Sequence, residues 1–331
     1  MAKTMFDYIN SSTELIEENL KKRIALTETM VNEYIKGPYH NITIVASGSS
    51  NNAAQCARLY MEKVLKCKVT VISPFEFIHA EHSVASDEMV IAVSQSGYSV
   101  NTMEALKFIN DKLNRKAIVL TGDLNSDIVS VADMAVDFGV GEETVGYVTK
   151  GVIALSLYLM LFALEAAKMC KIIGRNEYDT WVREFEKVSG AHEKMIVATK
   201  KFYADNIKAL TSLQTVYICS VGANMGTAME GALKVGETIQ VPGIAYELEE
   251  YIHGPNLQLT PNYTVFFIDG GLASDRTQEI FEATGVITDK TYMLTNKKGL
   301  EGKNIINPDF EINELITVSY THLTLPTKRI V

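Results

Sequence analysis

Three charged residues with regular spacing stand out in the second half of this 331-residue sequence. Glu230, Lys234 and Glu237 are separated by four and three positions, so a helix would place all three on one face. Their neighbours are almost all apolar, which predicts that this helix is buried. A glutamate in such a setting can move a proton while a lysine stabilises a developing oxyanion. A Glu–Lys pair at this spacing is also common on protein surfaces, so the chemical interpretation depends on the predicted burial.

Two segments rich in serine and glycine follow predicted strands in the first half, over residues 47–51 (SGSSN) and 94–99 (SQSGYS). A helix N-terminus offers unpaired backbone N–H groups and a favourable dipole to an anion, and small hydroxyl side chains add donors. Serine also caps helices without binding anything, so one such turn alone would favour capping. Two such turns at one edge of a sheet favour a phosphate site. Neither turn matches the glycine-rich patterns of nucleotide-binding proteins.

An α/β fold would position these residues. Short apolar runs alternate with amphipathic stretches, which indicates doubly wound parallel sheets that bind ligands at the carboxyl ends of their strands. Strand starts repeat at a nearly constant offset between the halves, so an internal duplication is predicted. The expected strands cover residues 42–46, 69–72, 89–93, 117–120, 134–138, 216–219, 264–268 and 292–294. The expected helices cover residues 5–36, 51–65, 100–113, 148–170, 179–212 and 225–239.

Four segments make up the predicted domain organisation. A helical lead-in covers residues 1–36, two doubly wound domains cover 37–175 and 176–316, and an anomalous tail covers 317–331. The tail has no helical period and resembles translated adapter sequence, so we interpret it as non-native. A disordered natural tail is the alternative.

Composition restricts the class of protein. The net charge of −9 argues against binding to nucleic acid or an anionic membrane surface, because both need a basic protein surface. The four scattered cysteines indicate reduced core residues, and the spacing of His79 and His82 makes no metal site. No signal peptide is recognisable, and the apolar run over residues 152–164 is shorter than a membrane span, which favours a buried helix. We therefore expect a cytoplasmic protein with neither metal nor cofactor.

Together, these motifs resemble the sugar isomerase (SIS) domain family. The resemblance rests on the two serine turns and, in the second half, on the segments EGALKVGE (residues 230–237) and EYIHGP (residues 250–255). It covers roughly residues 5–316 and is similar to the isomerase portion of glucosamine-6-phosphate synthase. It is also similar to stand-alone double-SIS proteins that act as fructosamine-6-phosphate deglycases or as amino-sugar-phosphate deaminases and isomerases.

The resemblance implies a role for each motif. The phosphate would bind to Ser50, Ser94, Gln95, Ser96 and Ser99, with Ser49 nearby. Glu237 would be the base that moves a proton between C1 and C2, supported by Glu230 and Lys234. His253 would open the sugar ring from the partner subunit of a homodimer. Thr149 and Lys150 resemble a pocket-lining motif of the family, although they equally well form a helix start.

Two functions remain open from the sequence. The first is an isomerase, deglycase or deaminase that acts on an amino-sugar or ketosamine 6-phosphate, without a glutaminase domain of its own. The family's tail lysine, which forms a Schiff base, has no counterpart here, and Lys328 is not assigned that role. The second is a phosphosugar sensor, which would need the serines but not the proton-transfer residues. The N-terminal segment is read as one helix, so no DNA-reading module is expected.

Overall fold

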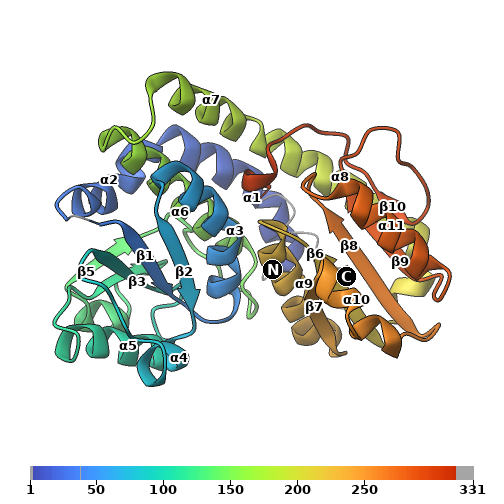
Figure 1. The fold of residues 1–331 in the computed structure, drawn as a ribbon, viewed down its shortest axis with the longest axis horizontal. Coiled ribbons are helices and arrows are strands. Elements are labelled where there is room, and N and C mark those ends of the chain that lie inside the picture. Colours follow the sequence, from blue (N-terminus) through green and yellow to red (C-terminus); the bar gives the residue numbers. More distant parts are fainter. Residues whose placement is uncertain (1–2, 38, 318–331) are drawn as a thin grey trace. The chain divides into compact units, whose positions relative to one another are not determined.

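A computed structural model describes residues 3–37 and 39–317, and these residues form two compact units. The N-sheet unit comprises Glu14–Thr144 and Val148–Glu186. The C-sheet unit comprises the described residues of Met1–Thr13, Val145–Tyr147 and Lys187–Val331. Each unit contains one parallel sheet flanked by helices (Figure 1). Most of the predicted tail, residues 318–331, lies outside the described residues.

The N-sheet unit has a five-stranded parallel sheet in the order β2-β1-β3-β4-β5. Its strands are β1 (Asn41–Val45), β2 (Lys68–Ile72), β3 (Glu88–Ser94), β4 (Ile118–Thr121) and β5 (Met134–Asp137). Its helical segments are α2 (Arg23–Tyr34), α3 (Gly48–Leu65), α4 (Pro74–His79), α5 (Val100–Asp111), η1 (Asp127–Val131), α6 (Lys150–Met169) and α7 (Arg175–Glu186). A further helix, α1 (Met5–Lys21), is divided between the two units.

The C-sheet unit repeats the same plan. Its strands are β6 (Thr215–Ser220), β7 (Gly243–Glu247), β8 (Tyr263–Asp269), β9 (Thr291–Thr295) and β10 (Ile305–Ile306). Its helical segments are α8 (Val188–Leu210), α9 (Asn224–Lys234), η2 (Val235–Ile239), α10 (Leu248–Ile252), η3 (Pro255–Gln258), α11 (Ser274–Gly285) and η4 (Glu314–Ile316). The strand order β10-β9-β8-β6-β7, read from the other edge in order along the chain, is the 2-1-3-4-5 order of the first sheet. All predicted strands are present, and the predicted fold class is confirmed.

Two predicted helices are each broken in the structure. The helix predicted over residues 5–36 ends at Lys21 and restarts at Arg23, because Lys22 leaves helical backbone angles (φ −97°, ψ 10°). The helix predicted over residues 179–212 is interrupted at Lys187, which separates α7 from α8 and begins a segment of the C-sheet unit. The prediction of single helices was therefore wrong at both positions.

Helix α6 is the most apolar element of the described chain. It is 20 residues long and has a mean hydropathy of 1.8 over its most apolar stretch, so by length and composition it matches a membrane-spanning helix. The expectation that this segment is too short was therefore wrong. However, 89% of that stretch is buried, and α6 packs against α2 and α3. The structure confirms that it is used as a core helix.

The four cysteines are free, but they are not all core residues as predicted. Cys56 and Cys219 are buried, Cys67 is half-buried and Cys170 is exposed at the end of α6. Burial raises the pKa of the Cys67 thiol to about 11, so this residue is protonated and unreactive at neutral pH.

Candidate functional site

The two serine turns lie at one edge of the N-sheet. Strands β1 and β3 pair in parallel, with Val45 opposite Ala92, so the turns that follow them are neighbours. Ser49 and Ser50 lie in the first turn of α3, where Ser49 is buried and Ser50 is half-buried. The backbone of Gly48 has φ +54°, a conformation that glycine adopts at little cost. The structure thus brings the predicted serines of both turns to the same sheet edge.

Hydrogen bonds between its own residues order the turn between β3 and α5. The Ser94 hydroxyl accepts from the N–H of Gly97 (3.2 Å), and the Ser96 hydroxyl accepts from the N–H of Tyr98 (3.3 Å). Ser99 precedes the first residue of α5, and its hydroxyl oxygen accepts from Thr102 Oγ1 (2.9 Å). In these bonds the serine hydroxyls act as acceptors, so their own O–H groups remain for a phosphate oxygen.

Gly97 fixes the path of this turn. Its backbone has φ +72°, and a Cβ atom there would lie only 1.8 Å from Ser126 Oγ. Any other residue would have to push Ser126 away, so the close approach of η1 to the turn depends on this glycine.

One acidic residue that the sequence interpretation missed joins this edge. The Glu143 carboxylate accepts from the backbone N–H groups of Thr149 (2.9 Å), Lys150 (2.6 Å) and Gly151 (3.1 Å) at the start of α6. It also accepts from Nε2 of Gln95 at 2.6 Å. Thr149 does not cap α6 with its own side chain, so Glu143 performs that role. An acid shortly before an uncapped apolar helix was the available sequence signal.

The three charged residues of the second half form a compact ionic cluster in the C-sheet unit. Lys234 Nζ lies 3.2 Å from Glu230 Oε1 and 2.7 Å from Glu237 Oε2. The side chains of Glu230 and Lys234 are 1% and 2% exposed, whereas that of Glu237 is 30% exposed. The predicted burial of this helix face is confirmed. Of the two carboxylates, Glu237 is therefore the one that a ligand can reach.

Glu237 owes its position to an irregular end of this helix. Helix α9 ends at Lys234 and continues as one π-helical turn, η2, that closes with Gln240 in a left-handed conformation (φ 63°). Turns of this type are rare and occur frequently at functional sites. The sequence interpretation gave a regular helix to residue 239 and did not anticipate this turn.

His253 lies on another element of the same unit. His253 follows the short helix α10 as its C-terminal cap residue, and Glu247 caps the start of this helix. The His253 side chain is exposed, and its N–H donates to the carbonyl of Glu250 (3.2 Å). The contact between His253 and Glu250 is thus a backbone one. His79 and His82 are both exposed.

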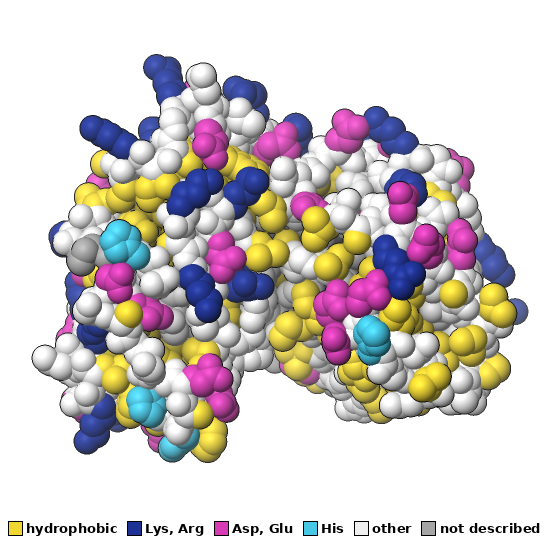
Figure 2. Space-filling model, viewed as in Figure 1, with side chains coloured by type: hydrophobic (Ala, Val, Ile, Leu, Met, Phe, Trp, Pro, Cys, Tyr) yellow, Lys and Arg dark blue, Asp and Glu magenta, His cyan; other side chains and the backbone are white. Residues whose placement is uncertain are grey.

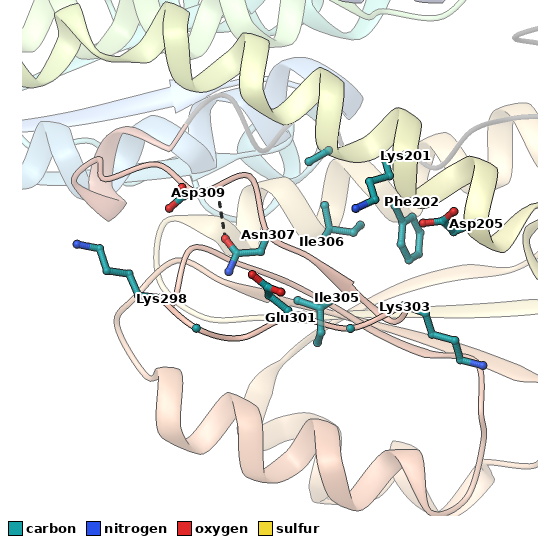
Figure 3. A pocket seen from close by; sticks show the side chains of 13 residues that line it. Lys201, Phe202, Asp205, Lys298, Glu301, Lys303, Ile305, Ile306, Asn307 and Asp309 are labelled. Carbon is teal, nitrogen blue, oxygen red and sulfur yellow. Dashed lines mark hydrogen bonds between the residues drawn. The ribbon is translucent and has the colours of Figure 1, made fainter.

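A cavity of about 600 Å³ in the C-sheet unit is lined by none of these residues. It lies between α8 and the segment around β10, where Lys201 and Asp205 lie opposite Glu301 and Asn307 (Figure 3). The Asn307 amide donates to the carbonyls of Lys297 and Leu300. Within the described residues, no group of three or more His, Cys, Asp or Glu side chains could hold a metal ion.

On the face shown in Figure 2, basic and acidic side chains are interspersed over both units. With a net charge of −9, that face presents no extended basic surface of the kind that nucleic acid requires.

Comparison with known proteins identifies the domain that carries the serine turns. Residues 38–165 match the SIS domain family. The chain is also 24% identical over 292 residues to glutamine–fructose-6-phosphate aminotransferase (isomerizing) of Neisseria meningitidis serogroup B, covering 85% of this chain and 47% of that relative. The chain thus spans about half the length of this curated relative.

Solved structures show that the two-sheet architecture is the α/β SIS fold. A candidate phosphosugar isomerase from Clostridium difficile 630 superposes with a TM-score of 0.86 at 23% identity, covering 98% of this chain and 92% of the other. The C-terminal domain of glucosamine-fructose-6-phosphate aminotransferase from Francisella tularensis superposes with a TM-score of 0.82 at 21% identity, covering 97% and 93%. The likeness to the isomerase portion therefore extends across both units of this chain.

Proposed function

We propose that this chain is an enzyme that moves a proton between C1 and C2 of an amino-sugar or ketosamine 6-phosphate, as an isomerase, deglycase or deaminase. The observation that carries the proposal is the ionic cluster: a reachable carboxylate, Glu237, bound to the buried ammonium group of Lys234. The likeness to phosphosugar isomerases and to the aminotransferase's isomerase portion supports the substrate class.

Glu237 is proposed as the base. Its carboxylate would take the proton from one carbon, the C–H electron pair would form the C1=C2 bond, and the carbonyl pair would move onto oxygen. The Glu237 carboxyl then gives a proton to the other carbon, where the C1=C2 pair forms the new C–H bond. The hydroxyl on the first carbon becomes the new carbonyl as its proton passes to the alkoxide left by the old one. The contact with Lys234 fixes Oε2 at 2.7 Å, so the side chain is oriented before a substrate arrives. Glu230 holds Lys234 from the other side at 3.2 Å.

The phosphate is proposed to bind to the serine turns of the N-sheet unit. Backbone N–H groups at the starts of α3 and α5 would bind its charge together with the hydroxyls of Ser50, Ser96 and Ser99. Ser49, Ser94 and Gln95 complete the proposed set. Ring opening by His253, contributed across a homodimer, and a cytoplasmic location also remain proposals.

The test is a screen of the full chain against glucosamine 6-phosphate, fructose 6-phosphate with ammonia, and fructose-amino acid 6-phosphates. We expect turnover of one of them, and a loss of about 10²- to 10⁴-fold in Glu237→Gln with the ligand still bound. Glu279→Gln is the matched control, because this glutamate of the same unit is exposed and pairs with Arg276. Unchanged turnover in Glu237→Gln would exclude it as the base. Binding of these ligands without turnover would indicate a phosphosugar sensor instead.

A further inference from the structure

Glu143 connects the turn between β3 and α5 with the start of α6 in the N-sheet unit. Its Oε1 accepts from the N–H groups of Thr149 and Lys150, and its Oε2 accepts from Gly151 and from the Gln95 side chain. Gln95 stands 48 positions earlier in the chain, in the turn between β3 and α5. One carboxylate therefore ties the start of α6 to a side chain of the phosphate turn.

Gln95 is held at both of its ends. Its backbone carbonyl accepts from the N–H of Gly122 at 2.9 Å, and its side-chain amide donates to Glu143 at 2.6 Å. The side chain also lies directly against the first turn of α6, since a Cβ atom at Gly151 would be 1.7 Å from Gln95 Oε1. The absence of a side chain at residue 151 therefore leaves the room that Gln95 occupies.

This arrangement has two consequences for anion binding. The first N–H groups of α6 already bind Glu143, so this helix start is not itself open to a phosphate. The Gln95 amide carries two N–H bonds and uses one on Glu143, which leaves the second for a ligand. Because the side chain is ordered in advance, binding costs less conformational entropy than it would for a free glutamine.

We propose that Glu143 is a positioning residue that orients Gln95 for the phosphate, with Gly151 providing the space. The inference rests on the proposed phosphate site. Glu143 is negatively charged and lies near the proposed position of the phosphate. If charge repulsion dominated, removing the Glu143 charge would strengthen phosphate binding. If Glu143 acts by positioning Gln95, removing that charge should weaken phosphate binding.

The experiment is a double-mutant cycle on the full chain, with fructose 6-phosphate binding measured by calorimetry. We expect Glu143→Gln and Gly151→Ala each to weaken binding about 3- to 10-fold, the range expected for losing one pre-ordered side chain. In a Gln95→Ala background, neither change should have a further effect. Gly151→Ala introduces no charge and places a good helix former in α6, so it displaces the Gln95 side chain without altering the charge of the site. Glu142→Gln removes the same charge from an exposed neighbour and should not weaken binding.

The outcomes separate this inference from the function on which it rests. No binding by the unaltered chain would reject the phosphate site itself. If the unaltered chain binds, the positioning role is overturned by unchanged or tighter binding in Gly151→Ala and Glu143→Gln. It is also overturned if both changes weaken binding equally in the Gln95→Ala background. That result would mean a purely structural effect on α6.

Discussion

The two sheets share one strand order, but the turns that follow equivalent strands carry different hydrogen-bonding side chains. In the N-sheet unit, β3 ends at Ser94 and the following hydroxyls accept hydrogen bonds within the turn. In the C-sheet unit, the equivalent strand β8 ends at Asp269, which is 2% exposed. Its carboxylate accepts from the N–H of Gly271 and the hydroxyls of Ser274 and Thr295. A built-in carboxylate thus occupies donors that an external phosphate would need.

The neighbouring pair of turns shows the same contrast. After β1, Ser50 remains half-buried at the start of α3. After β6, the buried Ser220 hydroxyl donates to the Ile268 carbonyl, and Asn224 accepts from the hydroxyl of Thr317. The duplicated frame therefore leaves serine-rich turns in one unit and places the ionic cluster in the other. Repeated topology does not imply repeated function.

The largest expected effect concerns the ionic cluster of the C-sheet unit. Lys234→Met breaks a buried ion pair, because it removes the ammonium group that lies 3.2 Å from the Glu230 carboxylate, whose side chain is 1% exposed. We expect a loss of about 3–5 kcal/mol in the free energy of unfolding, measured by urea titration. Lys298→Met is the control, because its ion pair with Glu311 is exposed and should contribute little to stability. Equal losses in the two variants would contradict the buried cluster.

A second change gives the turn after β3 of the N-sheet unit the aspartate found after β8 of the C-sheet unit. Ser94→Asp places a carboxylate at the position equivalent to Asp269. We expect phosphosugar affinity to fall at least about 100-fold, because the carboxylate would take the turn's donors and repel the phosphate. Calorimetry would measure this, with Ser94→Asn as the uncharged control. Retained affinity in Ser94→Asp would show that the phosphate does not bind in this turn.

The reverse change tests whether the turn after β8 could bind a phosphosugar without Asp269. Asp269→Ser removes a buried acceptor from Ser274 and Thr295, and we expect a loss of about 2–3 kcal/mol in the free energy of unfolding. No second phosphosugar site should appear, because Ser220 and Asn224 still fill the adjacent turn. A binding stoichiometry of two per chain would contradict this.

The smallest effect is a pH dependence of the C-sheet unit. Burial lowers the pKa of His192 below its ordinary value of 6.5, and its Nε2 lies 3.1 Å from the Ile9 carbonyl. The unfolded chain therefore binds this proton at a higher pH than the folded chain does. The free energy of unfolding should fall as the pH drops below about 6.5. The total loss is about 1.4 kcal/mol for each unit by which the pKa of His192 is lower in the folded chain than in the unfolded chain. Unfolding titrations of His192→Gln should show a flatter pH profile, and an unchanged slope would exclude His192 as the cause.

Most of the frame could be predicted from the sequence because its signals are local. The strands are nearly continuous apolar runs, and the serine turns follow two of them directly. Glu230, Lys234 and Glu237 were found because helical spacing alone brings them together. The edge strand β7 was missed because none of its residues is buried, so it is not an apolar run. Helix α10 was missed because its five residues are too few to show a helical period.

The remaining site features depend on contacts between residues far apart in the sequence. The bond between Gln95 and Glu143 joins two loops, and neither loop carries a pattern that specifies the other. The π-helical turn that carries Glu237 is a one-residue change of helical pitch, which side-chain spacing does not reveal. The helix breaks at Lys22 and Lys187 could not be predicted, because neither residue stands next to a glycine or proline.

The central proposal is that the serine turns bind the phosphate and that Glu237 moves the proton. It is tested most directly by following the exchange of the C1 protons of fructose 6-phosphate with D₂O by NMR, alongside the dissociation constant of this ligand. Glu237→Gln should lose exchange by at least about 100-fold and keep the affinity of the unaltered chain. The double variant Ser96→Ala, Ser99→Ala should lose affinity at least about 10-fold but regain exchange at saturating ligand. Equal losses of exchange and affinity in both variants would contradict this division of roles.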